Sequence, residues 1–126
     1  MSSLETPRHR IEGLGSAHSG LQQFWRLRVS AVALGPLSIW FLYAALGLAD
    51  AKQVSVLAFL QHPLNAVLMG AFMLLSSYHM TLGLKEVIED YVQADGIKLL
   101  LILLTRVFGF VVAIASVVAL LRIALA

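Results

Sequence analysis

The sequence predicts an all-α integral membrane protein built as a three-helix bundle. Of its 126 residues, 60% are hydrophobic and only 13% are charged, whereas about 25% of residues are charged in a typical soluble domain. It also contains three apolar runs, each long enough for the roughly 20-residue helix that crosses a bilayer core. We therefore expect the lipid bilayer, and not nucleic acid, as the surroundings of this chain, and its size leaves no room for a soluble catalytic domain.

The first apolar run predicts a transmembrane helix over residues 28–49. It reads VSAVALGPLSIWFLYAALGLA after Arg28 and contains no further charge. Pro36 lies inside this run and should kink the helix, because proline removes one backbone hydrogen bond. Residues 1–24 are then a cytoplasmic tail, and residues 25–126 are the membrane anchor domain.

The second span is placed by a proline. The uncharged stretch 53–84 is too long for one upright helix at about 1.5 Å per residue. Pro63 suits the first turn of a helix, so the second span is expected over residues 63–88. Residues 54–62 then form a connecting or interfacial segment, in which His62 is an interfacial or capping residue.

The third span is expected over residues 98–124, with Arg106 as its internal charge. Cytoplasmic loops of membrane proteins carry an excess of Lys and Arg. Six basic residues fall on the side of the N-terminus and of the connection between the second and third spans, and two fall on the other side: Arg8, Arg10, Arg26, Arg28, Lys85 and Lys98 against Lys52 and Arg122. The N-terminus should therefore be cytoplasmic and the C-terminus on the opposite side.

His79 lies inside the second predicted span, where an ionisable side chain usually faces the bundle interior or a cofactor. Three interpretations are open: a neutral histidine bonded to a neighbouring helix, a haem or metal ligand, and a proton relay. Neutral imidazole is a common axial ligand of haem iron. Ser76 and Gly83 share the helix side of His79 at about 100° per residue, and such small residues leave space for a flat macrocycle. The chain has no Cys, which excludes iron–sulfur ligation and C-x-x-C-H haem attachment.

Asp90 and Tyr91 lie at the cytoplasmic end of the same span. If the helix continues, Asp90 falls on the side of His79, roughly 16 Å along the axis. The pair is either a solvated helix end with an interfacial tyrosine, or a polar edge where a quinone accepts a hydrogen bond and protons. Arg28 and Arg106 are either anchors that reach the membrane surface or partners of a haem propionate or quinone oxygen.

These residues resemble a known family. The pattern H-x10-D-Y at the end of a second span, in HPLNAVLMGAFMLLSSYHMTLGLKEVIEDYV, is similar to the small hydrophobic anchor subunit of succinate dehydrogenase, respiratory complex II. The segment FWRLRVSAVALGPLSIWF looks like the arginine-led first span of its proteobacterial members. The resemblance covers about residues 20–124.

The resemblance implies a haem b held between this chain and a second, cytochrome b anchor subunit, with His79 as this chain's axial ligand. It places Tyr91 and Asp90 in a ubiquinone-reduction site and Arg28 beside the haem propionates. It also implies an iron–sulfur subunit and a flavoprotein subunit, which alone carry the iron–sulfur clusters and FAD. The chain would be one non-catalytic subunit of the enzyme, which passes electrons from succinate to ubiquinone in the tricarboxylic acid cycle.

The same resemblance favours the bacterial cytoplasmic (inner) membrane over the mitochondrial inner membrane. Two alternative functions stay open at this point. One is the anchor of a quinol:fumarate reductase, because these residues do not determine the direction of electron flow. The other is a cofactor-free small membrane scaffold or transporter; the lack of Asp and Glu at membrane depth argues against a proton-coupled transporter.

Overall fold

The computed structural model describes residues 17–126, and these form four α-helices and no strand. The helices are α2 (Ala17–Leu48), α3 (Gln53–Gln61), α4 (Pro63–Tyr91) and α5 (Asp95–Ala124). The all-α prediction is confirmed. Three segments, Gly20–Leu48, Pro63–Tyr91 and Asp95–Ala124, are long and apolar enough to cross a membrane.

Helices α2 and α5 begin before the predicted spans, which started at Arg28 and Lys98, whereas α4 begins at Pro63 and continues to Tyr91, past the predicted end of its span. Helix ends do not mark the membrane surface, so the span limits 28–49, 63–88 and 98–124 stay predictions. Most of the predicted tail, with Arg8 and Arg10, lies outside the described residues, whereas its last part belongs to α2.

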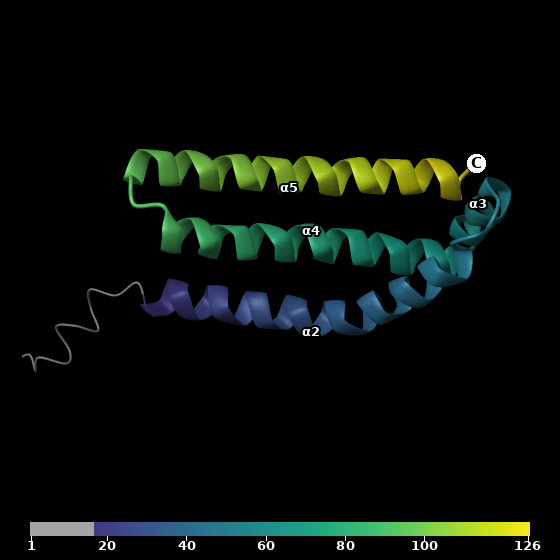
Figure 1. Ribbon diagram of the computed structural model, residues 1–126, viewed down its shortest axis with the longest axis horizontal. Coiled ribbons are helices and arrows are strands. Elements are labelled where there is room, and N and C mark those ends of the chain that lie inside the picture. The colour runs from purple at the N-terminus through teal and green to yellow at the C-terminus, as the bar shows by residue number, and fades with distance from the viewer. Residues whose placement is uncertain (1–16) are drawn as a thin grey trace, which may run out of the picture.

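The three long helices lie side by side in one row, with α4 between α2 and α5 (Figure 1). Neighbouring long helices run in opposite directions. The start of α2 and the α4–α5 connection lie at one end of the row, and α3 and the C-terminus lie at the other. Because the row is one helix thick, α4 has neighbours on two sides and is open on the two faces of the layer.

Helix α2 contains Pro36, and its ribbon curves toward α3 over its C-terminal part (Figure 1). Proline has no N–H to donate, and its ring crowds the carbonyl of the preceding turn. The bend is in line with the predicted kink. It brings the C-terminal part of α2 onto α3, where the rings of Trp40 and Phe59 stack with centroids 6.2 Å apart.

The predicted connecting segment 54–62 is largely the short helix α3. His62 ends α3 and occupies the N-cap position of α4, with Pro63 following in the first turn. His62 makes no side-chain capping bond; instead its backbone carbonyl accepts from the N–H of Ala66 at 2.9 Å. Asn65 Nδ2 donates to the carbonyl of Phe59 at 3.0 Å, which fixes α3 against the start of α4.

Small residues let α4 and α5 approach closely. A Cβ built on Gly109 would collide with the Thr81 methyl group and reach to 3.7 Å from the Ser77 carbonyl, and one on Gly70 would lie 3.3 Å from Leu120 Cδ2. On the other flank, Phe41 of α2 stacks on Phe72 of α4 at 4.5 Å. Small residues at helix contacts are typical of membrane proteins, where packing drives association.

We predict that Gly109→Ala destabilises the α4–α5 pair. Its methyl group enters the space of the Thr81 side chain, whose hydroxyl is bonded to the Tyr78 carbonyl at 2.7 Å, and overpacking of this kind costs about 1–3 kcal/mol. The melting temperature of the purified membrane complex should fall by several degrees. The control is Gly47→Ala, because a Cβ at Gly47 meets nothing within 4 Å; equal melting temperatures for the two variants would contradict the prediction.

Candidate functional site

His79 of α4 faces Ser30 of α2. The Ser30 Oγ atom lies 2.8 Å from His79 Nδ1 and 2.9 Å from the backbone carbonyl of Leu27. Ser30 is 3% exposed, so this contact is shielded within the α2–α4 interface. The structure thus gives His79 the bond to a neighbouring helix that the sequence left open as one interpretation.

The two contacts of Ser30 determine which nitrogen of His79 carries the proton. A hydroxyl has a single hydrogen, and a carbonyl oxygen can only accept. The Ser30 hydrogen is therefore donated to Leu27, since otherwise two acceptor oxygens would face each other at 2.9 Å. His79 Nδ1–H then donates to Ser30 Oγ, and a neutral ring in this tautomer carries its free lone pair on Nε2.

The Nε2 side of His79 is accessible. No hydrogen bond to Nε2 occurs among residues 20–126, and no buried polar side-chain atom in that part of the chain lacks a partner. Nε2 is therefore not enclosed. One turn further along α4, a Cβ built on Gly83 would meet nothing within 4 Å. These residues fit a flat metal macrocycle that needs one axial nitrogen and open space beside it.

A metal site made of protein ligands alone is not found in the part of the chain that the structure describes, which holds no group of three or more His, Cys, Asp or Glu side chains able to bind a metal ion. A haem brings four ring nitrogens of its own and asks the protein only for axial ligands. His62 is not a second ligand from the same chain. It occupies the N-cap position of α4, roughly 25 Å along the helix axis from His79 at about 1.5 Å per residue. His9 lies outside the described residues, as does the side chain of His18.

Asp90 and Tyr91 are the last two residues of α4 and are both exposed, Tyr91 by 81%. They lie at the end of the row where α4 connects to α5 (Figure 1). The structure does not bring them into contact with His79, from which they are separated by about three helical turns. An exposed carboxylate next to a phenol at a helix end can bind a polar head group and exchange protons with water.

Arg28 points away from the Ser30–His79 contact. It lies two residues before Ser30, which is about 200° around the helix, and its guanidinium stacks 5.0 Å from the ring centroid of Phe24. Its role beside haem propionates stays a prediction.

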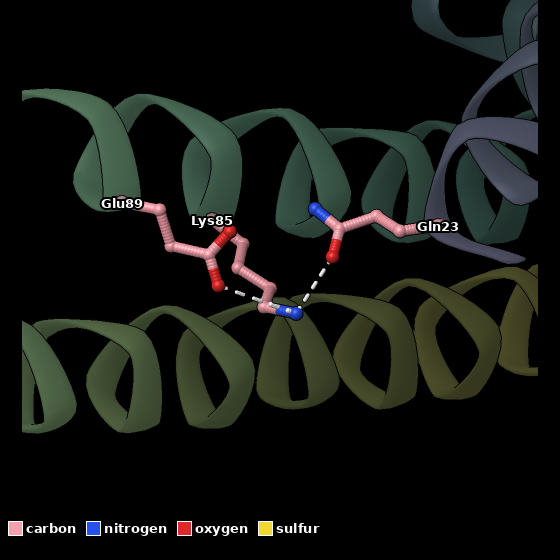
Figure 2. Close-up of polar contacts among 3 residues, drawn as sticks. All are labelled: Gln23, Lys85 and Glu89. Atoms are coloured by element: carbon pink, nitrogen blue, oxygen red, sulfur yellow. Dashed lines mark hydrogen bonds and ion pairs between the residues drawn. The ribbon is translucent and has the colours of Figure 1, made fainter. Parts of the chain in front are cut away.

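A polar hollow of about 480 Å³ is the feature that the sequence did not predict. It lies where α2, α4 and α5 come together, and Arg26, Lys85 and Arg106 line it together with Gln23. Lys85 Nζ donates to Gln23 Oε1 of α2 at 2.7 Å and lies 3.5 Å from a Glu89 carboxylate oxygen of its own helix (Figure 2). The number of basic residues on each side predicted only an orientation of the chain, whereas the convergence of Arg26, Lys85 and Arg106 depends on how three helices align.

The comparisons with known proteins agree with one another. The model of the succinate dehydrogenase/fumarate reductase transmembrane subunit family matches residues 2–113. A succinate dehydrogenase hydrophobic membrane anchor subunit of Paracoccus denitrificans is 37% identical over 120 residues, which is 95% of this chain and 92% of that protein. Anchor subunits of Rickettsia conorii and Rickettsia bellii are 34% and 29% identical, over 88% and 87% of this chain and 89% and 88% of their own lengths. No solved structure matches the chain significantly.

Proposed function

The chain belongs to the family of hydrophobic membrane anchor subunits of succinate dehydrogenase, and from this premise we propose that it helps to bind haem b and forms part of a ubiquinone-reduction site. The observation that carries the haem assignment is the Ser30–His79 hydrogen bond, 2.8 Å from Oγ to Nδ1. Ligation requires a neutral imidazole with a free lone pair, and Ser30 holds that lone pair on Nε2.

His79 and Ser30 have different roles in the proposed haem site. His79 would hold the iron, and the haem would supply a one-electron carrier within the membrane. Ser30, buried and bonded to its own helix, accepts the Nδ1–H of His79 and so orients the imidazole, as partners of metal-binding histidines commonly do. Gly83 leaves the adjoining surface clear, and Arg28 remains a candidate contact of the propionates.

The second axial ligand belongs to another subunit in this proposal. The described residues offer no second histidine near His79, and one face of α4 beside His79 is uncovered. A second, cytochrome b anchor subunit would cover this face and supply a histidine of its own. The flavoprotein and iron–sulfur subunits, with FAD and the clusters, would then dock at the end of the row that carries Asp90.

Tyr91 and Asp90 are the quinone-site residues of this chain. The Tyr91 hydroxyl would donate a hydrogen bond to a ubiquinone carbonyl oxygen, and the Asp90 carboxylate would orient that hydroxyl and relay protons from water. Reduction of a quinone consumes two protons, and the exposure of both side chains suits that supply.

The excess of Arg and Lys at the same end of the row makes that end cytoplasmic. The C-terminus then lies on the opposite side of a bacterial inner membrane. The direction of electron flow is assigned from the relatives, which are named as succinate dehydrogenase subunits, and this favours succinate oxidation over fumarate reduction.

The haem assignment predicts the optical spectrum of the complex. In reduced-minus-oxidised spectra, His79→Ala should remove or shift the b-type signal per flavin. Ser30→Ala should lower haem content by roughly 10-fold or more after washing, in line with the effect of losing a partner of a metal-binding histidine. Ser30→Thr keeps the hydroxyl and is the matched control, which should retain haem. A b-type spectrum identical to wild type in assembled His79→Ala complex would refute ligation by His79.

The quinone assignment predicts a selective loss of ubiquinone reduction in Tyr91→Phe. A hydrogen bond to a group that becomes charged contributes about 1.5–3 kcal/mol, so the rate with ubiquinone should fall roughly 10- to 100-fold. Succinate oxidation with a water-soluble dye that accepts electrons from the soluble subunits should be unchanged.

Tyr43→Phe is the control for this prediction. Tyr43 is also 81% exposed, but it lies in the C-terminal half of α2, toward the other end of the row. Loss of ubiquinone reduction in both variants, or in neither, would argue against a quinone site at Tyr91.

A further inference from the structure

The polar hollow continues into two apolar slots. One slot, of about 310 Å³, lies between α2 and α4 and extends to Ala33. The other, of about 200 Å³, lies between α4 and α5 and extends to Ala113. Tyr78 lines the hollow and both slots. The three spaces therefore form one branched depression with a polar centre and two apolar arms.

Both arms run in the same direction along the helices. The hollow is lined by residues 22–26 of α2 and 78–85 of α4, whereas the α2–α4 slot reaches residue 33 and the α4–α5 slot runs from residue 106 to 113. From the hollow, both slots therefore extend away from the α4–α5 connection and toward the middle of the helices. The polar centre thus lies near one membrane surface, with the arms pointing into the hydrocarbon.

The charge of the polar centre favours an anion. Its lining contains Arg26, Lys85 and Arg106 and neither Asp nor Glu. Over residues 20–126 the one ion pair is Lys85–Glu89, so Arg26 and Arg106 have no carboxylate partner there. Arg106 lies roughly 16 Å along α5 from its start, and a cation within a membrane span usually pairs with an anionic group or extends to the membrane surface.

We propose that this depression binds one anionic phospholipid, with the phosphate group in the polar hollow between Arg26, Lys85 and Arg106. The two acyl chains occupy the α2–α4 and α4–α5 slots, on either side of Tyr78. Charge complementarity and the two-armed shape together specify a diacyl lipid. The lipid belongs to the leaflet next to the α4–α5 connection, which is the cytoplasmic leaflet in the orientation proposed above.

The polar centre of this site is separate from the proposed haem face, and the α2–α4 slot meets the residues proposed to hold the haem only at Ser30. At about 100° per residue, Tyr78, Leu82 and Lys85 lie on one side of His79 around α4, whereas Ser76 and Gly83 lie on the other. Loss of the lipid should therefore leave the b-type spectrum in place, and the lipid site stands even if the haem proposal fails.

The first test measures lipid retained by the purified complex. Complexes washed in detergent are exchanged into nanodiscs that contain phosphatidylglycerol or only phosphatidylcholine, and bound lipid per flavin is counted by native mass spectrometry. We expect the double variant Arg26→Gln/Arg106→Gln to bind one phosphatidylglycerol fewer, with affinity about 30-fold weaker, from the contribution of two basic side chains. The control is Lys52→Gln/Arg122→Gln, which removes two cations from the opposite end of the row.

Two comparisons of bound lipid would overturn the proposal in this test, and so would one competition result. One is equal retention of phosphatidylglycerol in the double variant and the control. The other is equal affinity of the wild-type complex for phosphatidylglycerol and phosphatidylcholine. Displacement of the bound lipid by millimolar inorganic phosphate would also overturn it, because a site for a free anion would not require the acyl chains.

The second test keeps the arginines and does not depend on how well the double variant folds. Tyr78 is replaced by photoreactive p-benzoylphenylalanine in the complete complex, which is irradiated in its native membrane. A crosslink to phospholipid supports the proposal. A crosslink to another polypeptide overturns it, because a partner helix would then fill the depression.

Discussion

Hydrocarbon offers no hydrogen-bonding partner to a polypeptide backbone, and the rest of this structure depends on that constraint. The three long helices satisfy their backbone groups internally, and four of the hydroxyl side chains within them follow the same rule. Ser30, Ser77, Thr81 and Ser116 each donate to a carbonyl of their own helix, three or four residues earlier. Ser30 alone among these also accepts from a neighbouring helix. Because the Ser30 hydroxyl donates to the Leu27 carbonyl, His79 Nδ1–H must donate to Ser30 Oγ. The need to satisfy hydrogen bonds within hydrocarbon thus determines which nitrogen of His79 is free.

The flat row of helices gives the chain two different faces. One carries Gly83 and Ser76, which helical periodicity places on the same side of α4, and the other carries the cations of the polar hollow. Because α4 contributes to both faces, the haem and the lipid proposed for them would be held by opposite sides of a single helix. The packing of α4 against α2 and α5, through Phe72 and Gly70 among others, therefore supports both sites at once.

Much of the fold could be predicted from local sequence. Pro63 predicted the start of α4, and the composition predicted three apolar helices, because both depend only on nearby residues. The N-terminal extension of α2 to Ala17 could not be predicted from hydrophobicity, since a helix can continue beyond the membrane. The helical form of residues 53–61 was likewise left open as a connecting segment.

The candidate site was predictable only in part. Helical periodicity places His79, Ser76 and Gly83 on one side of α4, but it does not say which neighbouring helix faces them. Ser30 was therefore not identified, although a serine within an apolar span is a signal worth pairing with a histidine in another span. The polar hollow required the alignment of three helices, which no single segment specifies. Asp90 and Tyr91 stand at the end of α4 as expected, and their role remains a prediction.

The scarcity of buried residues has a consequence for the life of the protein in the cell. Over residues 20–126, only Ser30, Ala44, Ser77 and Gly109 are buried within the chain itself, so most of its packing surface is left for lipids and other polypeptides. A newly made copy has little folding free energy of its own, and its polar groups at membrane depth are poorly covered until it assembles. Copies synthesised in excess of their companions are then the ones that membrane proteases remove, which ties the abundance of this chain to the supply of its scarcest companion.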